Sequence, residues 1–338
     1  MNVGGVPDTP VILVTGKGGV GKSTIAAALA YSRAQAGHRT VLAEVSAYPA
    51  MGAFFSTAPG AGQPARQVDE RLHGILLDHD SCLRSYLEQH LEGSRLIRTV
   101  LSHPVALTFL RAAPSVTEVT TLNRIVQLAD DPRFDRVVVD LPAYGHAHQM
   151  LRAPQTIASM VRGGVITGPS ERIVGLLRTP ERASLVAVTL PEEMPVSETI
   201  EHAAKIKRDV GMATALVVLN QAVPPLVGEG AEAEARVAAL MAELDGVGSA
   251  AADAALAEVF DLGRLRAQAA SQTSTFIQEL IEGVDAPVIR VPVVTASTDP
   301  RALLETAADA LEQGGVMSQA TQAERASAPP GGPSASAP

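Results

Sequence analysis

Val11-Ile-Leu-Val-Thr-Gly-Lys-Gly-Gly-Val-Gly-Lys-Ser-Thr24 is the stretch of this 338-residue sequence that decides its fold. Residues 16–23 fit G-x-x-x-x-G-K-[ST], the pattern of the phosphate-binding P-loop. The aliphatic run 11–14 before the loop is typical of a buried parallel strand, and the Ala-rich residues 23–35 after it have helical spacing. Because strand, glycine loop and helix follow one another in the required order, we prefer this interpretation to a glycine-rich turn that matches by chance.

The loop has the chemistry to hold phosphate. Its glycines let the backbone turn tightly and direct several N–H groups at one anion, beside the positive end of the following helix. We expect Lys22 to reach the β- and γ-phosphates of a nucleotide and the Ser23 hydroxyl to bind Mg²⁺. The nucleotide-binding residues predicted in this segment are Gly18, Gly19, Val20, Gly21, Lys22, Ser23 and Thr24.

Composition restricts the class of protein. Hydrophobic residues make up 46% of the chain, enough for a substantial core, and the formal net charge of −9 argues against nucleic acid as the main partner. Cys82 is the only cysteine, which excludes an intrachain disulfide and a paired-thiol metal site. With neither a basic leader nor an apolar run of membrane-spanning length, we expect a soluble cytoplasmic protein without stable membrane insertion.

Several further segments predict an α/β fold. Strands are expected at residues 40–45, 74–78, 135–140, 184–190, 214–219 and 286–294, and a linker at 60–67. Helices are expected at 231–244, 251–281 and about 299–311. Apolar residues at helical steps between about 81 and 128 indicate a helical insertion. The fold predicted is that of a P-loop NTPase, a mostly parallel β-sheet with helices on both faces and this insertion.

A carboxylate extends the predicted site. The apolar run 137–139 ends in Asp140, as in a Walker B element, where the carboxylate holds Mg²⁺ directly or through water. Such a run is common, so the assignment depends on the P-loop upstream. In the loop expected at 141–146, Gly145 would allow the backbone to approach the γ-phosphate. His146 and His148 have no carboxylate partner in the sequence pattern and are interpreted as surface residues.

Four separated strings resemble one family. Lys17 directly after the first glycine gives K-G-G-V-G-K-S, which resembles the deviant Walker A motif of the MinD/ParA and ArsA-like ATPases. Residues 140–146 resemble the D-x-A-P-T-G-H switch of the ArsA-like branch, and residues 189–199 resemble its T-x-P-E-x-x-x-x-x-E-T string. Asn220-Gln221 matches its N-Q pair. The resemblance spans residues 11 to about 312 and is nearest to short bacterial members with one P-loop.

The resemblance implies ATP and Mg²⁺ as cofactors and a nucleotide-sandwich dimer, in which Lys17 contacts the phosphate bound to the partner. It also implies that Asn220 and Pro292 contact the nucleotide, the former at the adenine edge, and that Ser23 and Asp140 hold the metal. The alternative for Lys17 is a solvated loop lysine with no role, and we prefer the phosphate contact because the whole string matches. From the residues alone, an Asn at a strand end equally caps a turn.

The first switch departs from the family. The family reads S-T-D-P-A-H, whereas residues 44–49 here read E-V-S-A-Y-P, so that Ser46 stands where the family has the Asp that orients the attacking water. A serine hydroxyl cannot act as a general base at neutral pH. Glu44 lies two residues earlier on the same strand face and is a candidate replacement, the alternative being a carboxylate that only ends the strand. The catalytic residues predicted are Lys17, Lys22 and Glu44.

We therefore predict one P-loop ATPase domain over residues 1–316, followed by a disordered Ala/Ser/Pro-rich tail over 317–338. It would be a slowly hydrolysing ATPase, a homodimer or a heterodimer with a related ATPase, whose nucleotide state switches a surface for an unknown protein client. One alternative, motivated by Ser46, is a nucleotide-binding scaffold with little or no turnover. A MinD/ParA-type positioning ATPase is disfavoured, because the tail lacks an amphipathic helix and the acidic chain lacks a basic surface.

Overall fold

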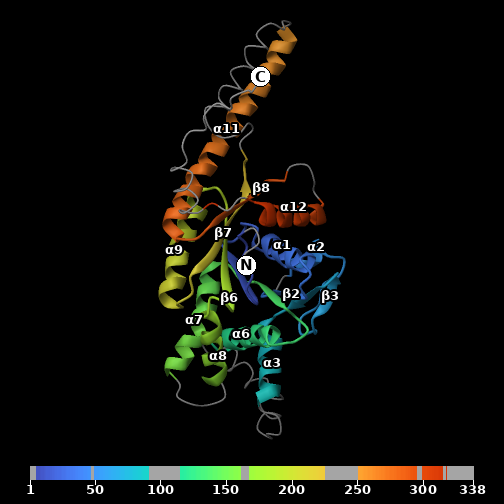
Figure 1. Cartoon of the computed structure of the whole chain (residues 1–338), viewed down its shortest axis with the longest axis vertical. Coiled ribbons are helices and arrows are strands. Elements are labelled where there is room, and N and C mark those ends of the chain that lie inside the picture. Colours follow the sequence, from blue (N-terminus) through green and yellow to red (C-terminus); the bar gives the residue numbers. More distant parts are fainter. Residues whose placement is uncertain are drawn as a thin grey trace, which may run out of the picture.

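Eight strands form one sheet in the order β3-β4-β2-β5-β1-β6-β7-β8 (Figure 1). The computed structural model describes residues 5–46, 49–90, 115–160, 167–224, 250–294, 299–314 and 317. The strands are β1 (Val11–Gly16), β2 (Thr40–Glu44), β3 (Arg66–Asp69), β4 (Leu72–Leu76), β5 (Arg136–Asp140), β6 (Ala183–Thr189), β7 (Thr214–Ala222) and β8 (Val288–Pro292). All neighbours pair in parallel except β3 and β4, which confirms the predicted mostly parallel sheet.

Strand β1 occupies the centre of the sheet, between β5 and β6. All of its six residues are buried, as expected for a parallel strand that is covered on both faces. Ile12 and Val14 pack toward one face and Leu13 toward the other, following the two-residue period of a strand. The P-loop therefore leaves the sheet at its middle, where strands on both sides surround it.

Helices cover both faces of the sheet (Figure 1). One face carries α1 (Lys22–Gln35), α2 (Met51–Phe54) and α12 (Pro300–Gln313). The other carries α6 (Val116–Ala129), α7 (Tyr144–Met160), α8 (Thr167–Leu177), α9 (Glu193–Asp209) and α11 (Ala250–Val284), and α3 (His79–His90) packs beside α6. In α1 the alanines 26–28 and 30 are buried, and their small side chains allow the helix to lie close to both the sheet and α12.

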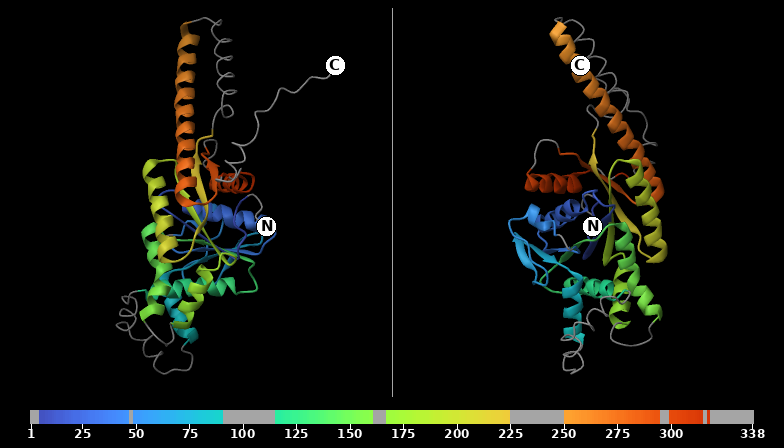
Figure 2. Two further views of the ribbon diagram at one scale, coloured as in Figure 1. Left: turned by 60° about the vertical axis from the view of Figure 1, so that its left-hand side comes forward. Right: turned by 180° about the vertical axis from the view of Figure 1, so that it is seen from behind.

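The long helix α11 extends well beyond the sheet (Figures 1 and 2). Its C-terminal part is anchored by Leu280 and Ile281, which are buried against β7 and β8, whereas Leu262 and Leu265 further out are 66% and 64% exposed. This helix confirms the one predicted at 251–281; the helix predicted at 231–244 lies outside the described residues. Among the helices that the structure describes, none is long and apolar enough to cross a membrane.

Some segments differ from the sequence predictions. The expected linker 60–67 is wrong at its end, because residues 66 and 67 belong to β3, a partly exposed four-residue edge strand. It pairs with β4 through a turn at Arg71, whose φ is 55°. Because β3 lacks alternating apolar residues, its sequence gives no strand signal. The loop expected at 141–146 is short, since α7 begins at Tyr144 and Gly145 lies in its first turn.

Parts of the predicted organisation fall outside the described residues. Helices α3 and α6 lie at the two ends of the predicted helical insertion, and its middle, residues 91–114, is not among those described. The same holds for the predicted tail except Met317, which pairs with Val288 through two backbone hydrogen bonds of 2.8 and 3.1 Å.

We expect Leu304→Ala to destabilise the protein by about 2–5 kcal/mol, because Leu304 is fully buried between α12 and the sheet and its truncation leaves a cavity. The neighbouring Leu303→Ala is the matched control, since Leu303 is only partly buried, and should cost about 1 kcal/mol. Urea unfolding followed by circular dichroism measures both. Equal losses would contradict the packing described for α12.

Candidate nucleotide-binding site

The loop between β1 and α1 has the backbone geometry of an anion cradle. Gly19 and Gly21 adopt φ values of 85° and 87°, a left-handed region that other residues enter only with strain. A Cβ on Gly16 would lie 2.4 Å from the Val188 carbonyl oxygen of β6. The first amides of α1 have no partner within the helix and face the same side as the loop. Of the predicted residues, 18–21 form the turn, with Gly18 and Gly19 exposed, and Lys22, Ser23 and Thr24 begin α1.

Lys22 is the first residue of α1 and folds back over the loop. Its Nζ donates a hydrogen bond of 3.1 Å to the backbone carbonyl of Lys17. Burial lowers the pKa of Lys22, and the nearby Asp140 carboxylate partly opposes this shift. A partly desolvated ammonium above a loop of amides provides a strong electrostatic attraction for phosphate oxygens.

Ser23 and Asp140 come together from α1 and β5. The Ser23 hydroxyl donates a hydrogen bond of 2.6 Å to Asp140 Oδ2. Asp140 is only 7% exposed, and its other oxygen, Oδ1, is buried without a partner. Burial raises the pKa of Asp140, while the Ser23 hydrogen bond and the Lys22 charge lower it. A buried hydroxyl–carboxylate pair with one unsatisfied oxygen suits Mg²⁺, which takes oxygen ligands.

Glu44 lies beside Asp140. The two residues are partners in the register of the parallel strands β2 and β5, so their side chains project from the same face of the sheet. Glu44 is 2% exposed; its Oε1 accepts a 3.0 Å hydrogen bond from the Ala50 amide, and its Oε2 is buried without a partner. Burial, with a further contribution from Asp140, raises the pKa of Glu44 to about 7. The candidate proposed to replace the family aspartate therefore lies beside Asp140, and Ser46 lies two residues beyond the end of β2.

Lys17 makes a contact that sequence reasoning missed. Its Nζ lies 2.7 Å from Glu198 Oε1 on α9, and the two side chains are 35% and 36% exposed. Glu198 is the glutamate of the E-T pair that ends the string 189–199. That string suggested the family but no role for this residue. Lys17 is therefore paired with a carboxylate of its own chain.

Asn220 contacts the P-loop. Its Nδ2 donates a 2.9 Å hydrogen bond to the Val20 carbonyl, and a Cβ on Gly21 would lie 2.3 Å from the same nitrogen. Strand β7 continues past Asn220, with Gln221 at φ 55° in an irregular step of its pairing with β8. Asn220 therefore holds the loop from β7, which is separated from β1 by β6, and the adenine contact stays a prediction.

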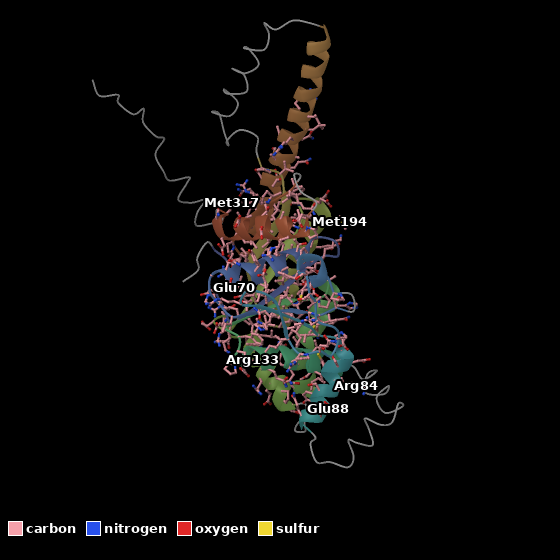
Figure 3. All side chains as sticks on the ribbon, turned by 90° about the vertical axis from the view of Figure 1, so that its right-hand side faces the viewer. Glu70, Arg84, Glu88, Arg133, Met194 and Met317 are labelled. Atoms are coloured by element: carbon pink, nitrogen blue, oxygen red, sulfur yellow. The ribbon has the colours of Figure 1, made fainter. Side chains whose placement is uncertain are left out.

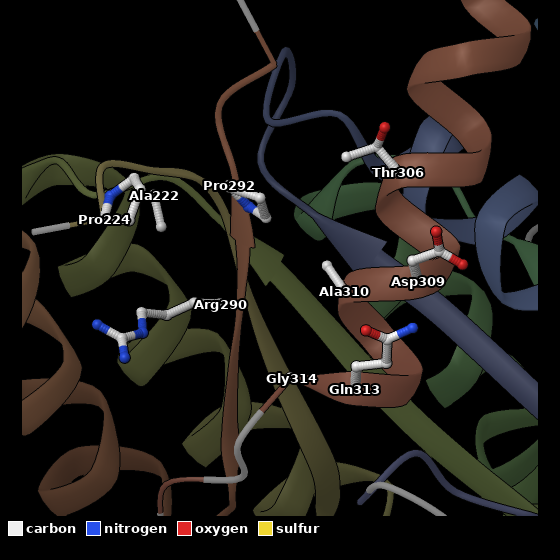
Figure 4. A pocket seen from close by; sticks show the side chains of 9 residues that line it. All are labelled: Ala222, Pro224, Arg290, Pro292, Thr306, Asp309, Ala310, Gln313 and Gly314. Atoms are coloured by element: carbon white, nitrogen blue, oxygen red, sulfur yellow. The ribbon is translucent and has the colours of Figure 1, made fainter. Parts of the chain in front are cut away.

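Pro292 lies one strand further from the P-loop. It ends β8, where its register partner is Ala222, two residues after Asn220. Together with Ala222, it lines a pocket of about 430 Å³ between the ends of β7 and β8 and helix α12 (Figure 4). The other residues lining it are Pro224, Arg290, Thr306, Asp309, Ala310, Gln313 and Gly314. The structure thus brings Pro292 to the same edge of the sheet as Asn220.

The two histidines of the switch segment differ from each other. His146 is exposed, as expected, whereas His148 Nε2 lies 2.9 Å from Asp209 Oδ2 of α9. Local sequence patterns could not predict this carboxylate, because it lies 61 residues away along the chain. Within the described ranges, no group of three or more His, Cys, Asp or Glu side chains could hold a metal ion.

The sheet and this site define a P-loop NTPase: a glycine loop leaves the central strand, a lysine and a serine begin the next helix, and a strand-end aspartate bonds the serine. Residues 9–168 match the family described as Anion-transporting ATPase, ArsA_ATPase. The ATPase BagA of Mycobacterium tuberculosis is 28% identical over 323 residues, which cover 89% of this chain and 92% of that protein.

Two relatives bear the name Arsenical pump-driving ATPase. That of Acidiphilium multivorum is 25% identical over 255 residues, 70% of this chain and 42% of the relative. That of Escherichia coli is 24% identical over 235 residues, 64% of this chain and 40% of the relative. The chain thus spans less than half of either. The fold, the site and these matches support an ArsA-like P-loop ATPase.

The stability of the nucleotide-free protein should depend on pH through Glu44. A carboxyl with a pKa of 4.5 when unfolded and about 7 when folded prefers to be protonated in the fold, so stability falls as pH rises from about 4.5 to 7 and the full cost persists above 7. Glu44→Gln removes this cost. We expect it to stabilise the protein by about 2 kcal/mol more at pH 8 than at pH 5, in EDTA.

The control for this measurement is Glu70→Gln. Glu70 is exposed in the turn between β3 and β4 (Figure 3), and its substitution should leave the pH dependence of urea unfolding as in the wild type. If Glu44→Gln behaves in the same way as this control, Glu44 is not held in the buried, protonated form described.

Proposed function

We propose that this ATPase binds Mg–ATP at the P-loop, hydrolyses it slowly as a dimer in the cytoplasm, and uses its nucleotide state to change a protein-interaction surface. The observation that carries the proposal is the Ser23–Asp140 hydrogen bond of 2.6 Å beside the loop amides, with Asp140 Oδ1 buried and unpartnered. An oxygen that is desolvated and unsatisfied costs stability unless a cation occupies the position it faces.

Separate residues of the site would bind the phosphates and the metal ion. The loop amides and Lys22 Nζ would bind the β- and γ-phosphates, and Asn220 keeps the loop in register by holding the Val20 carbonyl. Ser23 and Asp140 would hold Mg²⁺, which when bound neutralises charge on the phosphates. Adenine would lie toward Asn220 and Pro292, at the carboxyl ends of β7 and β8, the edge at which α/β sheets bind ligands.

Slow turnover follows from the first switch. Ser46 cannot accept a proton from water at neutral pH, which leaves Glu44 as the carboxylate on that strand face. Glu44 is tied through Oε1 to Ala50, and its free Oε2 is the atom that would orient water or support the metal site. The same replacement supports a second function: a nucleotide-binding switch with little or no turnover.

A steady-state assay of ATP hydrolysis separates these two functions. For the enzyme, we expect Lys22→Ala and Glu44→Gln each to lower kcat by roughly 100-fold, because one removes a phosphate donor and the other a water-orienting carboxylate. Lys207→Ala is the matched control, since Lys207 is exposed on α9. A wild type that binds Mg–ATP and does not turn it over would leave only the switch.

Dimerisation is proposed from the lysine of the deviant motif. Lys17 is about one-third exposed at the rim of the loop, where a second copy or a related ATPase could receive it. We expect native mass measurement to show a complex of two chains with Mg–ATP and one chain without nucleotide, and Lys17→Ala to weaken the complex. A single chain under all conditions would contradict the shared-lysine arrangement, and pull-down from the source cell would distinguish a homodimer from a heterodimer.

The activity in the names of two relatives is not extended to this chain. Cys82 is its only cysteine, and it is 5% exposed with a pKa raised by burial to about 11. A buried thiol of high pKa supplies no thiolate for a soft metalloid. The client is therefore proposed to be a protein rather than arsenite.

A further inference from the structure

The contact between Lys17 and Glu198 joins the P-loop to helix α9 across 181 residues of sequence. At 2.7 Å it is a direct ion pair, and both side chains remain about one-third exposed. Ion pairs in such partly solvated positions contribute little to stability. The direct contact orients Lys17 toward Glu198. Because the pair contributes little free energy, a competing anion can break it.

Glu198 is a fixed partner because the helix under it is held firmly. The adjacent Thr199 is 1% exposed, and its hydroxyl donates a 2.7 Å hydrogen bond to the Pro195 carbonyl. Since a threonine hydroxyl has one proton, the Tyr144 hydroxyl is the donor in its 2.7 Å contact with Thr199. The Tyr144 ring also stacks on His202, with the ring centroids 4.1 Å apart. These contacts attach this turn of α9 to the start of α7.

We propose that Glu198 is a positioning residue that holds Lys17 on its own chain in the absence of nucleotide, and that nucleotide phosphate displaces it. The inference rests on the proposed function, because it requires phosphate to bind in the loop. A triphosphate in the cradle places several negative charges beside Lys17, and Glu198 then competes with phosphate for one ammonium. The ion pair thus lowers the affinity of the resting chain for nucleotide.

The test compares Glu198→Gln with Glu201→Gln. Glu201 lies three residues further along α9 and pairs with Lys205 of the same helix at 2.6 Å, so it controls for loss of one negative charge from α9. The probe is the Mg²⁺ complex of a non-hydrolysable ATP analogue, titrated by calorimetry. We expect Glu198→Gln to bind it roughly two- to fivefold more tightly than the wild type, the range set by a partly exposed ion pair, and Glu201→Gln to bind it as the wild type does.

The Lys17→Ala background separates release of Lys17 from a general electrostatic gain. If Glu198 acts through Lys17, the substitution Glu198→Gln should have no effect on the dissociation constant once Lys17 is absent. Circular dichroism and the unfolding midpoint of each variant establish that α9 is intact.

Three results would overturn the proposal. They are unchanged affinity in Glu198→Gln, weaker affinity in Glu198→Gln, and a gain that persists without Lys17. Each of these can be obtained only if the wild type binds the probe, and then the proposed nucleotide-binding function stands. A wild-type chain that does not bind the probe would instead remove the proposed function and this inference with it.

Discussion

The close approach of the P-loop backbone to strands β6 and β7 is the constraint on which the rest of the structure depends. Gly16 lies against the Val188 carbonyl of β6, and Gly21 lies against the Asn220 side chain of β7, each at a distance that leaves no room for a Cβ. The loop can lie this close to the ends of β6 and β7 only because β1 is central and pairs in parallel with the strands beside it. The amides of α1 consequently point to one fixed place above the sheet.

The same parallel register gathers negative charge at that place. Asp140 and Glu44 end adjacent strands, face the same side and are both buried, with one unpartnered oxygen each. Without a cation, this arrangement is costly, which is why burial raises the pKa of both carboxyls. Under the proposed function, this loss of stability would keep oxygen ligands organised before a metal ion binds. Because Ser46 stands where the family has an aspartate, Glu44 is the carboxylate at this end of β2.

Local sequence patterns predicted the part of the site that is built from consecutive residues. The unit of β1, loop and α1, and the strand that ends in Asp140, follow from hydrophobic runs and glycine spacing, which act over a few residues. Contacts between distant segments gave no such signal. Glu198 meets Lys17, and Asn220 meets Val20, only because the sheet places β6 next to β1 and β7 next to β6. Strand β3 escaped prediction because it is short, only partly buried and without alternating apolar residues.

Helix α11 has a mechanical property that follows from its length alone. Its 35 residues extend over about 50 Å at 1.5 Å per residue, and its anchored end packs against α9, the helix that carries Glu198. A rod of this length that pivots at its base by about 5° sweeps its free end through about 4 Å. A small rotation of α11 at its base, too small to disturb core packing, would thus move its free end by about the distance between two atoms in contact.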